Sequence, residues 1–112
     1  MNKKTYIGKY DGYGLWYEKG YYNNNRVALQ IMCKDERGYI EPYAVATINL
    51  PEIDLPSDYP IDFETASKTY GFVNGDLDED FKGFLRENHI ISDAIRTVQY
   101  NYGQYELVEI LV

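Results

Sequence analysis

The alternation of apolar and polar positions predicts antiparallel strands through the first half of the chain. Thr5–Tyr10 and Tyr13–Lys19 flank Asp11-Gly12, a dipeptide suited to the positive φ angles of a tight hairpin turn. In residues 26–34 the larger apolar side chains fall on every second position, which is the period of a strand with one buried face. These segments predict a hairpin followed by a third, half-buried strand.

A longer alternating segment follows at residues 39–50 and is predicted to form one further strand. Pro42 lies within it and lacks an amide donor, so it marks a strand edge or a β-bulge. Leu50–Pro60 holds three of the four prolines and is predicted to be a surface loop. Residues 61–75 carry little periodic signal, apart from Tyr70–Val73, whose composition suits a short strand.

The clearest helical period lies at residues 76–88. Asp76 as N-cap and Glu79 three residues later form a capping-box pattern. Apolar residues then recur at helical spacing as far as about His89, and the acidic residues of the first turn suit the helix dipole. This segment is therefore predicted to be the principal helix of the chain.

Together these elements predict an α+β fold, with a mainly antiparallel sheet of about five to seven strands and one principal helix near residues 76–88. Residues 94–102 and 104–111 are predicted to form the last hairpin, around Gly103. The chain, 1–112, is expected to be a single domain, because 112 residues provide one core rather than two. The predicted packing contacts place Phe81, Phe84 and Leu85 on Val27, Leu29, Ile31 and Ile48.

Acidic residues gather in the middle of the chain. The net charge is −7, and residues 52–93 hold eleven of the eighteen carboxylates against three bases. Such a field repels phosphates and attracts basic partners, which argues against direct nucleic-acid binding. The alternative is a solvated acidic surface that only maintains solubility. The candidate acidic binding face comprises Asp54, Asp58, Asp62, Glu64, Asp76, Asp78, Glu79 and Asp80.

The chain is also rich in tyrosine, with thirteen in 112 residues. Tyrosine offers a large flat surface with one polar end, which suits protein contacts. Tyrosine is equally common on the exposed faces of sheets. The alternative is therefore that these tyrosines only cover a sheet face and bind nothing. The candidate aromatic binding surface comprises Tyr13, Tyr17, Tyr21 and Tyr22.

No motif indicates catalysis, a metal or a cofactor. Cys33 shares the buried face of its strand and is predicted to be a core residue, while His89 lies at the end of the predicted helix. One cysteine and one histidine are too few for a zinc-type site. Asp76 and Glu87 have calcium-loop spacing, but Phe81 stands where that loop requires glycine. We therefore expect that the protein is not an enzyme and that it binds no metal and no cofactor. The competing class is a carboxylate-based hydrolase.

Two bulk properties bear on location. The longest apolar stretches are far shorter than the roughly 20 residues that span a bilayer, and no apolar segment follows the basic N-terminus as in a signal peptide. A single cysteine cannot form an internal disulfide, which suits a reducing compartment. The sequence therefore predicts a soluble cytoplasmic protein.

Three segments carry a family resemblance: Tyr22–Gln30, Glu41–Glu52 and Phe84–Asn88, of which the second, with Asn-Leu-Pro after a strand, is the most specific. Through them, residues 21–110 resemble a small uncharacterised domain-of-unknown-function family found on conjugative and integrative elements of bacteria. Residues 62–74 depart from the asparagine-rich, tryptophan-containing pattern of that family. The family has no established activity, so the resemblance implies a setting among the accessory genes of mobile elements.

These observations predict a non-enzymatic, acidic protein-binding module of a mobile genetic element. The sharpest form of the hypothesis is an anti-CRISPR or anti-restriction inhibitor that imitates DNA and occupies a basic nucleic-acid-binding channel. The expected partner is a basic, nucleic-acid-binding defence protein, with no direct binding to nucleic acid or membrane. The alternatives are an accessory or ligand-binding module that uses the tyrosine-rich sheet, and a structural subunit of a larger assembly.

Overall fold

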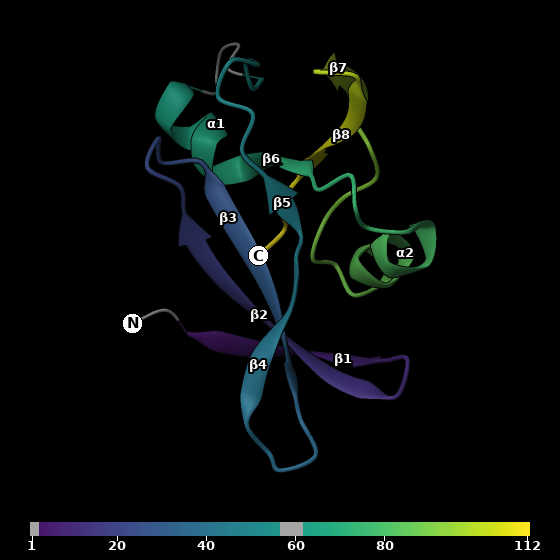
Figure 1. The fold of residues 1–112 in the computed structure, drawn as a ribbon. Coiled ribbons are helices and arrows are strands. Elements are labelled where there is room, and N and C mark those ends of the chain that lie inside the picture. Colours follow the sequence, from purple (N-terminus) through teal and green to yellow (C-terminus); the bar gives the residue numbers. More distant parts are fainter. Residues whose placement is uncertain (1–2, 57–61) are drawn as a thin grey trace.

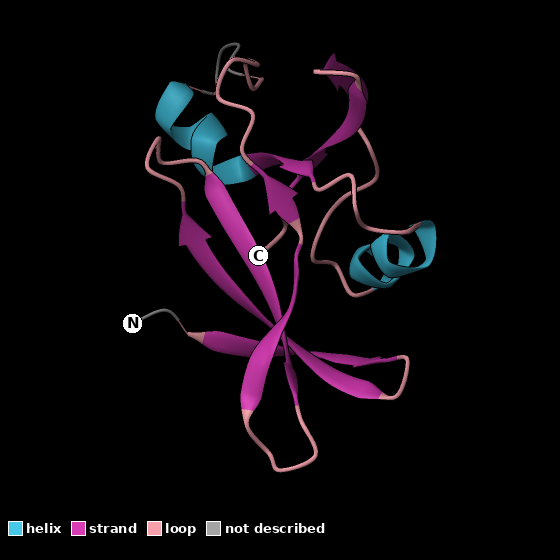
Figure 2. Cartoon of the chain, in the orientation of Figure 1, coloured by secondary structure: helices cyan, strands magenta, loops and turns pink. Residues whose placement is uncertain are grey.

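A computed structural model describes residues 3–56 and 62–112. In this part of the chain, eight strands form two four-stranded antiparallel sheets, and two short helices pack beside them (Figures 1 and 2). Sheet A has the order β1-β2-β3-β4, and sheet B has the order β5-β6-β8-β7. The strands are β1 (Lys4–Tyr10), β2 (Tyr13–Tyr21), β3 (Val27–Lys34), β4 (Ile40–Val45), β5 (Thr47–Ile48), β6 (Tyr70–Val73), β7 (Arg96–Tyr100) and β8 (Gly103–Glu109); the helices are α1 (Phe63–Thr69) and α2 (Glu79–Glu87).

Two-residue turns close the first and the last hairpin. Asp11 and Gly12 have φ angles of 50° and 83° between β1 and β2, which confirms the first predicted hairpin. Asn101 and Tyr102 have φ angles of 46° and 69° between β7 and β8. The last predicted hairpin is thus also present, and Gly103 begins its second strand rather than occupying the turn.

The predicted strand over residues 39–50 is wrong, because the chain changes sheets within it. The Ala46 N–H donates to the Leu29 carbonyl at 2.8 Å, and the Ala46 carbonyl accepts from the Asn74 N–H at 2.9 Å. The Thr47 hydroxyl also accepts from the Leu29 N–H, at 3.0 Å. Residues 40–45 therefore belong to sheet A and residues 47–48 to sheet B, so Ala46 joins the two sheets.

Helix α1 was not predicted, although its start carries a recognisable cap. The Asp62 side chain accepts from the Thr65 N–H at 2.8 Å, which satisfies one of the donors left unpaired at a helix start. Glu64 and Lys68 form an ion pair one turn apart at 3.4 Å. The helix leads directly into β6, the short strand predicted at Tyr70–Val73.

Helix α2 begins two residues later than predicted, because Asp78 rather than Asp76 is its N-cap. The Asp78 side chain accepts from the Phe81 N–H at 2.8 Å. Asp76 lies instead in the preceding turn, where its N–H donates to the Asn74 side chain. The prediction of one sheet of about five to seven strands with one principal helix is therefore wrong: the described residues form eight strands in two sheets and two short helices.

Replacing Asp78 with alanine should lower the free energy of unfolding by about 1 kcal/mol, because the cap hydrogen bond is lost. The matched control, Asp76→Ala, removes the same charge two residues earlier and should cost less than about 0.5 kcal/mol. Urea unfolding followed by circular dichroism measures both. Equal losses would contradict the assignment of Asp78 as the cap.

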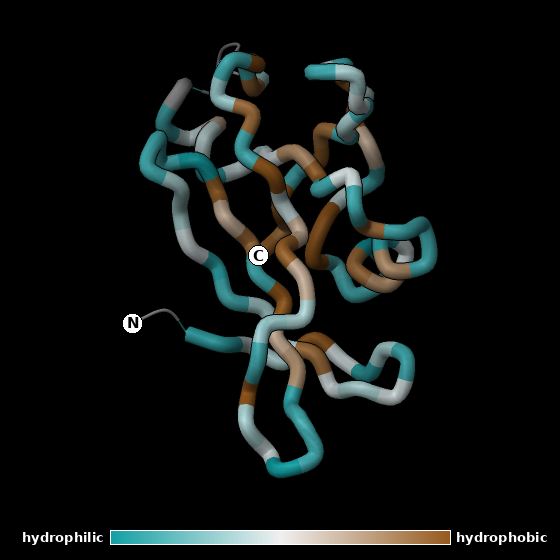
Figure 3. The backbone as a smooth tube through the Cα atoms, viewed as in Figure 1, coloured by the Kyte–Doolittle hydropathy of each residue, from teal (hydrophilic) through white to brown (hydrophobic). Residues whose placement is uncertain are grey.

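The buried apolar residues form two clusters. In Figure 3 the hydrophobic stretches gather in the middle of the molecule, and the hairpin tips are hydrophilic. The first core joins the inner face of sheet A to α2 and includes Val27, Leu29, Ile31, Phe81 and Leu85, with Phe84 packed against it. The second core lies on sheet B and α1, and Ile48 packs there rather than against the helix as predicted.

Candidate functional site

Five aromatic side chains from four elements meet beside the β1–β2 turn. Tyr10 and Tyr13 flank the turn, Tyr43 lies in β4, and Phe81 and Phe84 lie in α2. Ring centroids are 5.2 Å apart for Tyr10 and Phe81, 5.1 Å for Tyr10 and Phe84, 5.6 Å for Tyr43 and Phe81, and 6.4 Å for Tyr13 and Tyr43. These tilted and edge-on contacts are the favoured geometry of aromatic pairs. The five rings form one continuous aromatic cluster.

A β-bulge brings Tyr43 to this cluster. In the β3–β4 register Ile31 pairs with Ala44 and Met32 pairs with Pro42, so Tyr43 is the extra residue between them. A bulge redirects the side chain that it inserts, and Pro42 cannot donate to the ladder at this point. The predicted mark of Pro42 as a strand edge or bulge is thus confirmed.

The cluster runs from the first core to the surface. Phe81 is only 5% exposed, Tyr43 is 37% exposed, and Tyr13 is 50% exposed. Large aromatic side chains that are half open to solvent while their inner neighbours are fixed in a core are common at protein interfaces. The outer rings therefore offer a preformed contact surface.

Three carboxylates lie close enough to the tyrosines of this surface to affect them. Desolvation raises the pKa of Tyr10, and the nearby charges of Asp78 and Asp80 raise it further. Desolvation also raises the pKa of Tyr43, with added effects from Asp11 and Asp78. Within the described residues none of these three carboxylates belongs to an ion pair. We call Tyr10, Tyr13, Tyr43, Asp11, Asp78 and Asp80 the aromatic–acidic patch.

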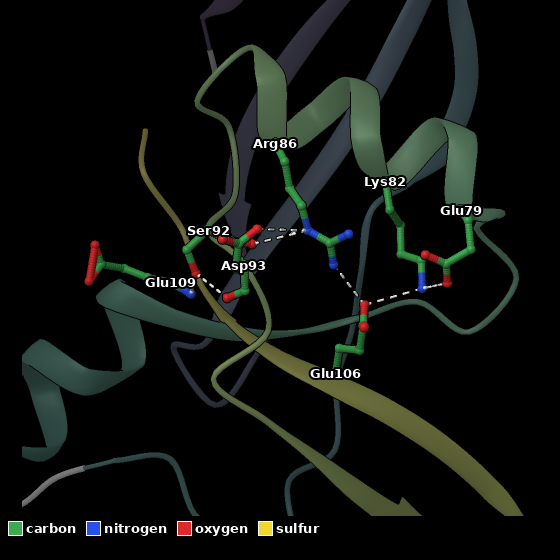
Figure 4. Close-up of polar contacts among 7 residues, drawn as sticks. All are labelled: Glu79, Lys82, Arg86, Ser92, Asp93, Glu106 and Glu109. Atoms are coloured by element: carbon green, nitrogen blue, oxygen red, sulfur yellow. Dashed lines mark hydrogen bonds and ion pairs between the residues drawn. The ribbon is translucent and has the colours of Figure 1, made fainter.

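Three other charged residues of α2, Glu79, Lys82 and Arg86, form a network with β8 (Figure 4). Glu106 accepts from Lys82 at 3.1 Å and from Arg86 at 2.9 Å. Lys82 also pairs with Glu79 at 2.7 Å, and this hydrogen bond lowers the pKa of the Glu79 carboxyl. Arg86 approaches Asp93 at 4.0 Å. Glu79, which the sequence placed in the acidic face, is therefore largely neutralised by Lys82.

The described acidic residues of the 52–64 segment lie on another part of the molecule. Figure 1 places α1, next to this segment, and α2 on opposite sides. Asp62 caps α1 and Glu64 pairs with Lys68. Desolvation lowers the pKa of the Arg26 guanidinium, and the nearby charge of Asp54 opposes this shift. Asp58 lies outside the described residues. The eight predicted acidic residues thus do not form one face.

The four predicted tyrosines are also separated. Tyr13 joins the aromatic–acidic patch, whereas Tyr17 is half-buried against the first core. Tyr21 is exposed at the far end of β2, about 26 Å away at the usual rise of a strand. The hydroxyl of Tyr22 bonds to Thr47, at 3.1 Å from its side-chain oxygen and 3.3 Å from its carbonyl.

Tyr21 borders a shallow cleft of about 580 Å³ between the β2–β3 loop and α1. Its described lining is polar apart from the tyrosine ring: Asn24, Asn25, Glu64, Ser67 and Lys68. The cleft is open to solvent, and Glu64 and Lys68 within it are paired with each other. It is a feature that would favour a small-ligand function.

The only thiol of the chain is buried. Burial raises the pKa of Cys33, and Glu41 and Asp35 raise it further, so the reactive thiolate is disfavoured. This confirms Cys33 as a core residue. Among the described residues no group of three or more His, Cys, Asp or Glu side chains is arranged to hold a metal. No helix in the described part is both long and apolar enough to cross a membrane.

Sequence reasoning found only part of the patch. It named Tyr13, Asp78 and Asp80 but assigned them to two rival surfaces, and it missed Tyr10, Asp11 and Tyr43. The sequence places Asp11 in the hairpin turn and Tyr10 in the strand before it, and neither is among the predicted binding residues. The sequence feature that could have identified them is their position at a two-residue turn, because such a turn brings the side chains on either side of it close together.

The comparisons with known proteins place the chain in a family without naming a function. The sequence model of a family described as Domain of unknown function (DUF4313) matches residues 18–112. No curated protein and no solved structure matches the chain. The family match confirms the predicted resemblance to a small domain of unknown function, while the mobile-element setting stays an expectation. The chain therefore belongs to the DUF4313 family of domains of unknown function.

Proposed function

We propose that this protein is a non-catalytic binding module whose aromatic–acidic patch binds a basic segment of a partner protein. The observation that carries the proposal is the meeting of exposed tyrosine rings with three carboxylates that have no ion pair in the described part of the chain. The disfavoured thiolate of Cys33 supports the non-catalytic part.

The chemistry of the patch suits arginine and lysine. The aliphatic stem of either side chain can lie on the faces of Tyr13 and Tyr43, while its charged end meets the carboxylates. Arginine fits better, because its planar guanidinium both stacks on rings and binds carboxylates with two hydrogen bonds. The net charge of −7 would steer a basic partner toward the protein from a distance.

The narrower form of the proposal concerns what the partner does. A basic segment that normally contacts phosphates would be blocked when it binds carboxylates instead, so the protein would act as an inhibitor of a nucleic-acid-binding protein. A CRISPR or restriction component is the partner expected from the mobile-element setting. The support for this form is the charge complementarity of the patch and the overall acidity of the chain.

The test removes charge from the patch without disturbing the fold. The double variant Asp11→Asn, Asp80→Asn keeps an Asn-Gly pair in the turn, which that turn favours, and a polar residue on the exposed helix surface. We expect its affinity for the partner to fall about three- to tenfold. The affinity of the unmodified protein should also fall steeply as salt rises.

The matched control is Glu36→Gln, Glu87→Gln, which removes two exposed charges outside the patch and should leave the affinity within about twofold. The partner is first purified with the tagged protein from a host that carries CRISPR and restriction systems, and affinities are then measured by calorimetry. If the affinity falls equally in the patch variant and the control variant, binding depends on the overall charge of the protein and not on the patch. If neither variant changes the affinity for the partner, the patch is not the binding surface.

A second candidate function rests on the cleft beside Tyr21. A volume of about 580 Å³ with an aromatic ring and two asparagine side chains is large enough for a small polar ligand. This alternative uses a surface far from the patch, so Tyr21→Ala separates the two functions. Loss of function in Tyr21→Ala, with Asp11→Asn, Asp80→Asn unchanged, would favour the ligand-binding module.

A further inference from the structure

Strand β7 forms an open edge of sheet B. It pairs with β8 on one side, and no described strand pairs with its other side. The two-residue turn closes on the pair Tyr100 and Gly103, so the alternation of an antiparallel ladder directs the backbone groups of Thr97 and Gln99 away from β8. Both side chains are exposed. An edge of this kind is a template for another strand.

The other three sheet edges carry features that discourage such pairing. In β1 the register shifts between Tyr6 and Gly8, and the strand carries two lysines. In β4 the bulge at Tyr43 and the missing donor of Pro42 interrupt the ladder. Strand β5 is only two residues long. By contrast, β7 contains no proline or lysine, and its pairing with β8 has no register shift.

The strand and its turn carry little charge of their own, and carboxylates of other segments lie beside them, Glu52 at the Tyr100 side chain and Glu106 opposite Thr97. Residues 94–105 contain no carboxylate and one base, Arg96, in a chain with eighteen carboxylates. Two copies of a protein with a net charge of −7 repel each other in general, but here they can approach without bringing carboxylates of these segments together. The segment also exposes apolar side chains at both ends, with Ile95 before β7 and Tyr102 after it.

We propose that β7 pairs with β7 of a second copy of this chain, antiparallel and with the two Val98 residues opposite each other. The two B sheets would then form one continuous sheet around a two-fold axis. In this register Thr97 lies opposite Gln99 of the second copy, and Arg96 lies opposite Tyr100, so no like charges of the two strands face each other. The Arg96 guanidinium donates to the Asp54 carbonyl of its own copy at 3.2 Å. This interface lies apart from the aromatic–acidic patch and is independent of the proposed function.

Analytical ultracentrifugation over a range of protein concentrations tests the pairing. The unmodified protein should sediment as a dimer that dissociates on dilution. In the variant Thr97→Lys, Gln99→Lys, introduced lysines face each other twice across the axis, so the dimer dissociation constant should rise at least about tenfold. In Thr97→Lys, Gln99→Glu, each introduced lysine faces an introduced glutamate, so the constant should stay within about threefold of the original.

Circular dichroism shows whether the variants are folded. We expect them to fold, because Thr97 and Gln99 are both exposed. The proposal is overturned if the unmodified protein is a monomer at every concentration, or if both folded variants dissociate equally. An independent readout needs no variant: amide hydrogen exchange at Thr97 and Gln99 should slow as protein concentration rises. Exchange rates that do not depend on concentration would also overturn it.

Discussion

Replacing Phe72 with alanine is expected to lower the free energy of unfolding by about 3–5 kcal/mol. Phe72 is 1% exposed and lies in β6, with Ile48 of β5 on one side and Leu107 of β8 on the other. The loss combines the transfer energy of the removed ring with the cost of a cavity in the second core. Because domains of this size have only about 5–15 kcal/mol of stability, the change removes a large part of it.

The same variant shows whether the two sheets unfold together. Trp16, the single tryptophan, lies in β2 of sheet A, while Phe72 lies in sheet B. The backbone hydrogen bond from Ala46 to Leu29 ties the start of sheet B to β3, so we expect cooperative unfolding. In urea, tryptophan fluorescence and circular dichroism should therefore shift to the same lower midpoint.

The control for Phe72 is Phe72→Leu, which keeps much of the buried volume and should lose clearly less stability. If the fluorescence midpoint of Phe72→Ala stays in place while the circular dichroism midpoint falls, the sheets unfold separately. If Phe72→Ala costs no more than Phe72→Leu, the second core is not closely packed around the ring.

Local signals were enough to predict the hairpins. Asp11-Gly12 defines its turn through backbone preference alone, and the alternation in residues 26–34 follows from one buried face. The break at Ala46 has no such signal, because it depends on hydrogen bonds with Leu29 and Asn74 that are distant in sequence. Residues 39–50 alternate as one strand would, so the sequence pattern could not reveal the change of sheet.

The helix starts show how close the competing signals were. Asp76 and Asp78 both precede the helix, and only Asp76 has a glutamate three residues later. The Asp76 N–H donates to the Asn74 side chain, which places Asp76 in the turn before the helix. The Asp78 side chain accepts from the Phe81 N–H and therefore caps the helix. Helix α1 spans only seven residues, so its period could not be distinguished from a loop.

The candidate site required contacts that sequence spacing does not encode. Tyr13 and Tyr43 are thirty positions apart, and the bulge of β4 decides that their rings meet. Asp78 and Asp80 were recognisable as acidic, but their closeness to Tyr10 follows from the packing of α2 beside the first hairpin. The sequence could therefore supply candidate residues for binding, and the fold decided which of them are neighbours.

Replacing Glu106 with alanine is the second large change that we expect, with a loss of about 1–3 kcal/mol in the free energy of unfolding. Glu106 is the acceptor that holds both Lys82 and Arg86 of α2 against β8 (Figure 4). The Lys82 side chain is only 12% exposed, so it cannot recover full hydration when that partner is removed. Its remaining pair with Glu79 should keep the loss below that of a fully buried ion pair.

The control is Glu109→Ala in the same strand. Figure 4 shows the Glu109 side chain directed away from the network, and its backbone N–H rather than its carboxylate bonds to Ser92 at 2.8 Å. The control should therefore cost less than about 0.5 kcal/mol in the same urea titration. Equal losses would mean that the network does not hold α2 to the sheet. Because α2 carries Phe81 and Asp80 and begins after its N-cap Asp78, a loosened helix should also weaken binding at the patch, although Glu106 is not part of it.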